Sequence, residues 1–337
     1  MKTRICIIGA GSFGTALSVV LDKSGADVTL WAREREIAQG IMEQHRNPAY
    51  LTDIHLPETV RCTINLEEAL HGAQYVLFAT PSHTLREMAA NVAPYLQGHE
   101  RIVSVAKGLE NETYLRMSEV LAEVLGDVID TDHIGVISGP SHAEEVALFM
   151  PTTVVVAANS RGVAKAIQET FMTPMFRIYL NHDIVGVEIA GAVKNVMAIA
   201  SGILQGMNMG DNAIAALMTR GLHEMKRMGL KMGASQDTFS GLAGMGDLIV
   251  TCTSEHSRNR SVGFRIGQGE SLTEIMDSMN MVAEGVKTTA SVHDWAQQNR
   301  IEMPITSAVH RILFEGTCPN EALFDLMTRN PKDEIAF

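Results

Sequence analysis

Residues 4–31 of the chain read RICIIGAGSFGTALSVVLDKSGADVTLW. Arg4–Ile8, with its apolar run at 5–8, predicts a short buried strand, and the apolar spacing over 15–23 predicts a helix. Asp27–Trp31 predicts a second strand. The three segments together predict a strand–helix–strand unit, which is the building block of a parallel sheet.

Gly9, Gly11 and Gly14 form a G-x-G-x-x-G sequence at the turn between the first strand and the helix. Such glycines permit a tight turn, close approach of the backbone to a pyrophosphate, and close packing of helix on strand. The free N–H groups at the helix N-terminus also attract phosphates. The motif therefore predicts a dinucleotide site. The alternative is a glycine turn that serves packing alone.

The residues after the second strand bear on the choice of nucleotide. An Asp or Glu there commonly binds the ribose 2′-hydroxyl of NAD. Here the chain continues as Ala32-Arg33-Glu34-Arg35, so a guanidinium stands where it can meet a 2′-phosphate. NADP(H) is therefore favoured, while Glu34 keeps NAD(H) possible. Arg35 is equally explained as a solvated surface residue.

Strand and helix signals continue to alternate through the first half of the chain. Further strands are expected at residues 75–79, 101–105, 134–137, 153–158 and 176–180, with helices between them. This alternation predicts an α/β fold with a doubly wound, largely parallel sheet, which is a Rossmann-type domain over residues 1–183. The segments after three of these strands, at Thr80-Pro81, Lys107 and 139–141, should converge on one crevice, because ligands bind beyond the carboxyl ends of such strands.

Residues 184–337 show helical periodicity in place of strand signals and predict an all-α domain that carries substrate and catalysis. Its first segment, 184–207, reads IVGVEIAGAVKNVMAIASGILQGM and is apolar or small on nearly every side, as in a buried helix. Lys194 is the exception. Either its ammonium extends to the surface, or it faces a pocket as a proton-transfer group whose pKa burial has lowered.

The stretch 241–260, GLAGMGDLIVTCTSEHSRNR, is rich in groups that can bind ligands. Its glycines allow the backbone to approach a ligand closely. Asp247 could cap a helix or pair with a lysine such as Lys194. Ser257, Arg258 and Asn259 place hydroxyl, guanidinium and amide donors together at an expected helix N-terminus, which suits a phosphate. The alternative is a basic pair on a solvated helix.

Composition restricts the classes of function. A formal net charge of -12 argues against a general nucleic-acid binder. The four cysteines show no C-x-x-C spacing, which favours a reducing compartment and gives no support to a zinc site or a disulfide framework. The lead before the first apolar run is too short for a secretory signal, and Lys194 interrupts the nearest candidate for a membrane span. We therefore expect a cytoplasmic protein without membrane insertion, a nucleic-acid partner or a metal in its site.

Six motifs stand out along the chain: GAGSFGTAL (9–17), AKGLE (106–110), SGPSHAEEVA (138–147), EIAGAVKNVMAIASG (188–202), GLAGMGDLIVTCTSEHSRNR (241–260) and VAEGVKT (282–288). In this order they resemble the motifs of bacterial NAD(P)-dependent glycerol-3-phosphate dehydrogenases, and the resemblance runs from about residue 5 to 322. Phe13 stands where many members have Trp, and His142 where Phe is common; both keep a ring beside the cofactor.

The resemblance implies an enzyme that interconverts dihydroxyacetone phosphate and sn-glycerol 3-phosphate for glycerophospholipid synthesis, and it favours a homodimer. It implies Lys194 as the catalytic acid/base, assisted by Lys107 and Asp247. With the motif glycines, the cofactor-binding residues are Gly9, Gly11, Ser12, Phe13, Gly14, Arg33, Tyr50, Lys107, Ala143, Arg258, Val282 and Glu284. The substrate-binding residues are Lys107, Gly139, Ser141, Lys194, Asp247, Ser257, Arg258 and Asn259, with Thr251 as a helper.

Two other functions are compatible with parts of this pattern. One is a different dehydrogenase of the same two-domain plan, acting on a β-hydroxyacid or a sugar-acid phosphate. The motifs at 244–247 and 257–260 argue against it. The other is a catalytically silent NADP(H)-binding sensor, which should have lost Lys194 or Asp247, whereas both are present.

Overall fold

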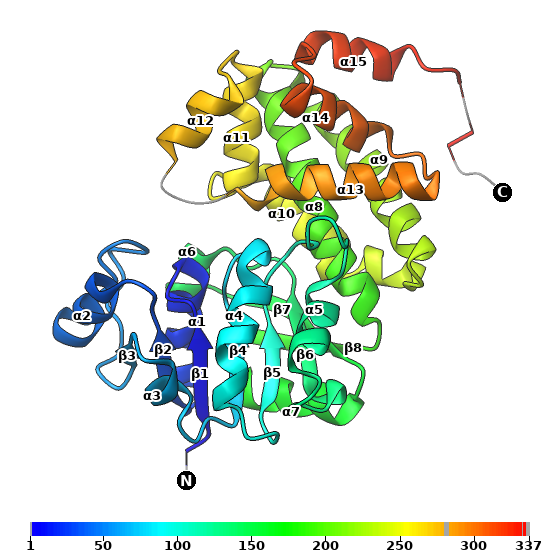
Figure 1. Ribbon diagram of the computed structural model, residues 1–337. Helices are drawn as coiled ribbons and strands as arrows, with labels where there is room; N and C mark the ends of the chain where they lie inside the picture. The colour runs from blue at the N-terminus through cyan, green and yellow to red at the C-terminus, as the bar shows by residue number, and fades with distance from the viewer. Residues whose placement is uncertain (1, 280–282, 332, 335–337) are drawn as a thin grey trace.

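The computed structural model describes residues 2–279, 283–331 and 333–334. A sheet with helices on its two faces forms one half of the molecule, and a group of helices forms the other (Figure 1). We call the first half, up to residue 181, the sheet part, and the second, from residue 184, the helical part. The predicted α/β fold followed by an all-helical region is confirmed.

The sheet has eight strands in the order β3-β2-β1-β4-β5-β6-β7-β8. Neighbouring strands are parallel except β6 and β7, which are antiparallel. The first six positions have the order of a dinucleotide-binding sheet, in which the strand order, not the strand direction, reverses between β1 and β4 and opens a crevice there. The strands are β1 (Arg4–Ile8), β2 (Asp27–Trp31), β3 (Arg61–Thr63), β4 (Tyr75–Phe78), β5 (Arg101–Ser104), β6 (Ile134–Ser138), β7 (Thr152–Ala158) and β8 (Phe176–Asn181).

Alternate residues of each strand face opposite layers of helices. Ile5 and Ile7 of β1 pack in a core with α1, α2, α6 and α7, while Cys6 and Ile8 pack in a second core with α3, α4 and α5. Burial on both faces explains why central strands such as β4 and β6 are continuous apolar runs. These helices are α1 (Ser12–Lys23), α2 (Arg35–Gln44), α3 (Leu66–Leu70), α4 (Leu85–Val92), α5 (Met117–Leu125), α6 (Ala143–Ala147) and α7 (Arg161–Phe171).

Two features of the sheet were not anticipated from the sequence. Strand β3 has only three residues, RCT, which is too short to show a periodic pattern. The antiparallel β7 depends on how the chain returns after α6, and its own apolar run is the same for either direction.

Helix α8 (Ile184–Gly206) is the axis of the helical part and packs against α9, α10, α11, α13 and α14. The Asp183 carboxylate caps it by accepting from the Gly186 N–H at 2.8 Å. By length and composition alone α8 could cross a membrane, but 94% of its apolar window is buried within the protein. The other helices are α9 (Gly210–Lys231), α10 (Asp247–Thr253), α11 (Arg258–Gly267), α12 (Leu272–Ser278), α13 (Glu284–Asn299), α14 (Pro304–Phe314) and α15 (Pro319–Met327).

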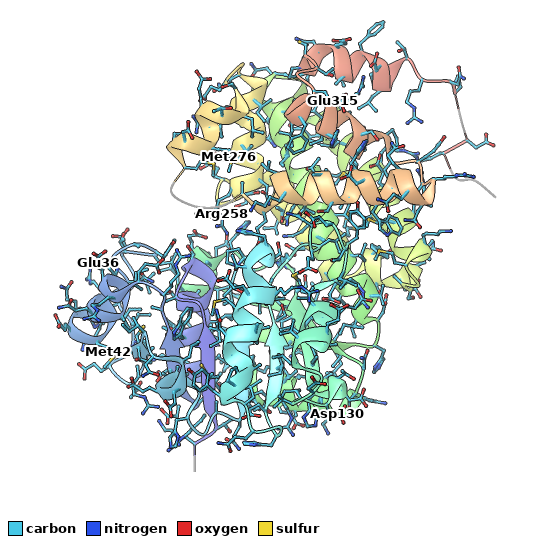
Figure 2. The ribbon with its side chains drawn as sticks, viewed as in Figure 1. Glu36, Met42, Asp130, Arg258, Met276 and Glu315 are labelled. Carbon is cyan, nitrogen blue, oxygen red and sulfur yellow. The ribbon has the colours of Figure 1, made fainter. Side chains whose placement is uncertain are left out.

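Glycines allow α8 and α11 to cross with their backbones in contact. A Cβ added at Gly202 of α8 would lie 2.0 Å from the carbonyl oxygen of Arg260, and one added at Gly263 of α11 would lie 2.0 Å from that of Ile199. No side chain fits in either place. This crossing fixes the N-terminus of α11, so that Arg258 lies where the helical part faces the sheet part (Figure 2).

Candidate active site

A cavity of about 480 Å³, which we call the central cavity, lies between the carboxyl ends of the strands and the helical part. Most of the predicted site residues line it. They are Gly9, Gly11, Ser12, Phe13, Arg33, Tyr50, Lys107, Ser141, Ala143, Lys194, Asp247, Thr251, Ser257, Arg258, Asn259 and Glu284. Gly14 and Gly139 are not among the described residues that line the cavity, and Val282 lies outside the described residues.

The glycine-rich turn combines the two roles weighed for it. Gly14 serves packing, because an added Cβ would lie 1.9 Å from the carbonyl oxygen of Gly9. Gly9 has φ +111° and sits against β4, where a Cβ would lie 2.9 Å from the oxygen of Ala79. Gly11 has nothing within 4 Å of its Cβ position, so the backbone faces open space just before α1 begins. This cradle fits the pyrophosphate of a dinucleotide.

Arg33 follows β2 at the rim of the cavity, with 80% of its side chain exposed. Its guanidinium forms an ion pair with Glu34 at 2.5 Å. A 2′-phosphate at this rim would compete with Glu34 for the guanidinium. The exposed guanidinium of Arg33 suits the 2′-phosphate of NADP(H), because the two charges are opposite. The carboxylate of Glu34 can accept a hydrogen bond from the 2′-hydroxyl of NAD(H).

A buried carboxylate joins two lysines at the centre of the cavity. Lys194 Nζ of α8 donates to Asp247 Oδ1 at 2.5 Å and to Thr251 Oγ1 at 2.8 Å. Lys107 Nζ, from the loop after β5, donates to Asp247 Oδ2 at 2.8 Å and to the Gly139 carbonyl at 3.0 Å. Lys194 is 5% exposed, so its ammonium does not extend to the surface. Asp247 is the first residue of α10 and accepts from the lysines instead of capping the helix.

Burial and neighbouring charge set the protonation of this cluster. Burial lowers the pKa of Lys194 to about 8; Asp247 opposes the shift and Lys107 adds to it. Burial raises the pKa of Asp247, but the charges of Lys107 and Lys194 outweigh it and hold that pKa below its usual range. Lys194 can therefore both give and take a proton near neutral pH beside a permanently ionised carboxylate.

The N-terminus of α11 borders the same cavity. Ser257 is the N-cap residue, and its Oγ accepts from the Arg260 N–H at 3.2 Å. Asn259 Oδ1 accepts from the Gly285 N–H at 2.9 Å, which ties α11 to α13. The positive end of the helix dipole and the guanidinium of Arg258 at this end suit a phosphate.

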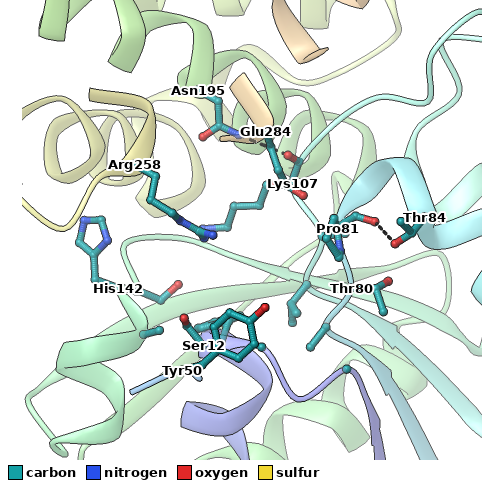
Figure 3. A pocket seen from close by; sticks show the side chains of 18 of the residues that line it. Ser12, Tyr50, Thr80, Pro81, Thr84, Lys107, His142, Asn195, Arg258 and Glu284 are labelled. Carbon is teal, nitrogen blue, oxygen red and sulfur yellow. Dashed lines mark hydrogen bonds between the residues drawn. The ribbon is translucent and has the colours of Figure 1, made fainter. Parts of the chain in front are cut away.

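Glu284, the first residue of α13, reaches across to the sheet part, where its Oε1 accepts from the Ser82 N–H at 2.9 Å. Burial raises the pKa of Glu284, although the Ser82 N–H and the charge of Arg258 act against the rise. Figure 3 shows Glu284, Lys107 and Arg258 gathered on one side of the cavity, with Ser12 and Tyr50 opposite them.

Asn195 and His256 are among the cavity residues that were not predicted as site residues from the sequence. Asn195 donates through Nδ2 to the Lys107 carbonyl at 3.2 Å and so joins α8 to the loop after β5. His256 packs at 5.9 Å, centroid to centroid, against His142. Lys194 and Ser257, which adjoin Asn195 and His256 in the sequence, were predicted as site residues. The position of Asn195 directly after Lys194 could have indicated Asn195. Nothing local indicated that position 256 faces position 142.

A glycine-rich turn at the switch point of a doubly wound sheet faces a buried lysine and a basic helix N-terminus supplied by a helical part. This combination defines the two-domain dehydrogenases that use a nicotinamide dinucleotide.

Comparison with known proteins specifies the family. The family model described as NAD-dependent glycerol-3-phosphate dehydrogenase N-terminus matches residues 4–164, and the corresponding C-terminus model matches 183–324. The chain belongs to the NAD-dependent glycerol-3-phosphate dehydrogenase family.

Individual relatives agree over their full lengths. A glycerol-3-phosphate dehydrogenase (NAD(P)+) of Salinibacter ruber is 53% identical, over 99% of this chain and 97% of its own. One from Pelotomaculum thermopropionicum is 48% identical, over 99% of this chain and 96% of its own. The crystal structure of glycerol-3-phosphate dehydrogenase from Coxiella burnetii superposes with a TM-score of 0.92 at 41% identity, covering 97% of this chain and 99% of that one.

Proposed function

We propose that the protein catalyses the reversible reduction of dihydroxyacetone phosphate to sn-glycerol 3-phosphate, with NADPH favoured and NADH accepted. The observation that carries this proposal is the position of Lys194, a buried lysine with a pKa of about 8 in a cavity that also contains a dinucleotide cradle and a phosphate anchor. The named relatives catalyse a reaction that needs all three elements.

A dinucleotide whose pyrophosphate lies in the cradle would supply a hydride from its dihydronicotinamide to the C2 carbonyl carbon of the substrate. Lys194, as ammonium, hydrogen-bonds the carbonyl oxygen and gives it the proton that the resulting alkoxide needs. In the oxidative direction the free amine accepts the proton from the C2 hydroxyl. Asp247 and Thr251 orient the Nζ of Lys194 through the bonds of 2.5 and 2.8 Å.

Lys107 adds a second positive charge near the oxygen on which negative charge develops. A charge that is already in place contributes more in a water-poor cavity than in solution. Lys107 is held by Asp247 and by the Gly139 carbonyl, so it needs little reorganisation as the reaction proceeds. Ser141, which donates to the same carbonyl at 3.0 Å, lines the substrate side of this loop.

The substrate phosphate is assigned to the N-terminus of α11, where Arg258, Asn259 and Ser257 gather. Anchoring the phosphate there orients the carbonyl toward Lys194, because binding energy from the non-reacting end is used for positioning. Lys107 belongs to the sheet part and Lys194 to the helical part, so we expect closure of the two parts over the substrate to complete the site.

The cofactor residues take corresponding roles. The turn from Gly9 to Gly14 with Ser12 and Phe13 holds the pyrophosphate side, and Arg33 with Tyr50 holds the adenosine side. Ala143 and Glu284 bind near the nicotinamide end, with Val282 assigned by resemblance alone. We further propose two domains, residues 1–183 and 184–337, in a cytoplasmic homodimer that supplies glycerophospholipid synthesis without inserting into a membrane.

Absorbance at 340 nm tests the activity directly. Purified protein with dihydroxyacetone phosphate should oxidise NADPH, and NADH more weakly, while the Lys194→Ala variant should not. A panel of β-ketoacids and sugar-acid phosphates serves as the control for substrate class. Oxidation of neither cofactor with dihydroxyacetone phosphate, or faster turnover of a member of the panel, would overturn the proposal.

A further inference from the structure

Two histidines from adjacent helices face each other in the helical part. His293 of α13 and His310 of α14 stack with ring centroids 4.0 Å apart and ring planes inclined by 14°. Asp294 follows His293, and one potential ligand atom from each of the three residues lies within 4.8 Å of the other two. None of the three is among the described residues that line the central cavity. The cluster is therefore separate from the dehydrogenase site.

The ring nitrogens of this pair are not satisfied by packing alone. His310 Nδ1 lies 3.0 Å from Glu315 Oε1, which leaves Nε2 of His310 for another group. His293 Nδ1 is buried and has no hydrogen-bond partner among the described residues. A buried polar atom without a partner costs free energy. An apolar residue in place of His293 would fill the space between α13 and α14 without this cost.

The donor atoms of the cluster suit a cation. A neutral imidazole offers a nitrogen lone pair to a metal ion. Two imidazoles and a carboxylate form a donor set typical of Zn²⁺, whereas Mg²⁺ and Ca²⁺ prefer oxygen ligands alone.

We propose that His293, Asp294 and His310 bind a divalent transition-metal ion of the zinc class, with Glu315 orienting the His310 ring. Two nitrogens bound tetrahedrally at about 2.1 Å lie about 3.4 Å apart, so small side-chain rotations bring atoms within 4.8 Å into position. A carboxylate on the second ring nitrogen is the usual support of a metal-binding histidine.

The surroundings allow such an ion to enter. The His310 side chain is 18% exposed and Asp294 is exposed, so solvent reaches the cluster and a water molecule can complete the coordination. The ion ties α13 to α14. Because α13 begins at Glu284 in the central cavity, the ion also steadies the helix that carries one of the cavity residues.

Zinc binding to metal-free protein tests the proposal. The parent for all measurements is Cys318→Ser, because the exposed thiol of Cys318 could itself bind Zn²⁺. After dialysis against EDTA and then buffer, calorimetric titration with Zn²⁺ should show one strong site per chain. Saturating Zn²⁺ should raise the Tm, because an ion that binds only the folded state stabilises it. A parent without a strong site would overturn the proposal.

Substitutions of the proposed ligands test which residues bind the ion. His293→Gln and His310→Gln should each lose the strong site and the rise in Tm. Glu315→Gln should weaken binding by about 10–100-fold, as loss of a supporting carboxylate does. His99→Gln, an exposed histidine of the sheet part, is the matched control and should bind like the parent. Retention of the site and of the Tm rise in both His293→Gln and His310→Gln would overturn the assignment.

Discussion

Replacing Asp247 by Asn separates two roles of this carboxylate, the setting of the Lys194 charge and the holding of the Lys194 side chain. Asp247 is 1% exposed and contacts Lys194 at 2.5 Å and Lys107 at 2.8 Å. Burial lowers the pKa of Lys194 to about 8, and Asp247 is the largest influence against that shift. The Asn side chain keeps the shape of the Asp247 side chain and removes its negative charge. Burial and Lys107 then act with less opposition, and the pKa of Lys194 falls further.

The expected change in the pKa of Lys194 follows from the shift that an opposite charge causes at contact distance. An opposite charge in contact shifts a pKa by about 1–3 units, so a loss of about two units lowers the pKa of Lys194 from about 8 to about 6. At about pH 7.5 the ammonium fraction then falls from about three quarters to about 3%, which reduces the reductive kcat about 25-fold. The free-amine fraction, which the oxidative direction needs, rises about fourfold under the same conditions.

The assay is kcat in both directions across the pH range, followed at 340 nm. In the parent protein the reductive kcat should decline as pH rises through about 8, because the ammonium is lost. In Asp247→Asn the decline should begin at lower pH, and the ratio of reductive to oxidative kcat should fall; this ratio cancels any loss of orientation common to both directions. Asp183→Asn, which alters a cap at the far end of α8, should leave the profile in place. An equal loss of kcat at every pH would refute the electrostatic role.

Four further outcomes are expected. Lys194→Ala should lower kcat by about 10²–10⁴-fold while NADPH still binds in a fluorescence titration; near-normal turnover would contradict the acid/base role. Arg258→Ala should raise the KM for dihydroxyacetone phosphate about 10–100-fold through the lost charge-assisted bonds, and an unchanged KM would exclude Arg258 as the anchor. Arg33→Asp should shift the preference from NADPH toward NADH, as measured by kcat/KM for each; the same preference in both proteins would remove the reason for favouring NADP(H). Gly202→Ala should lower the free energy of unfolding by about 1–3 kcal/mol because its Cβ meets the α11 backbone. Gly162→Ala, at an exposed position of α7 where an added Cβ would lie 3.6 Å from Ser160 Oγ, should be neutral or slightly stabilising in the same denaturant titration.

Much of the fold could be predicted because its signals are local. Hydrophobic patterning over a few residues indicated β1 and β2 at the bounds that the structure shows, and the G-x-G-x-x-G spacing indicated the turn between β1 and α1. Each of these depends on hydrogen bonds and side-chain spacing within about a dozen residues. The short β3 escaped prediction because three residues are too few to show a period.

The chemical state of Lys194 was open at the level of sequence, since a lysine in an apolar helix can extend to the surface or remain buried. Tertiary structure chose between these states. It brought Asp247, 53 residues away in the chain, to 2.5 Å from Lys194, and brought Lys107, 140 residues from Asp247, to the other carboxylate oxygen. The close crossing of α8 and α11 placed the basic helix N-terminus beside them.

The sequence by itself determined the alternation of strands and helices apart from the short β3, the glycine turn, and the residue types available for chemistry, because these follow from the local covalent chain. Tertiary structure alone decided the antiparallel β7, the pairing of Asp247 with two lysines in place of a helix cap, the contact of His256 with His142, and the stacking of His293 on His310. A pKa or a partner depends on burial and on charges from distant parts of the chain, and those distances exist only once the chain has folded.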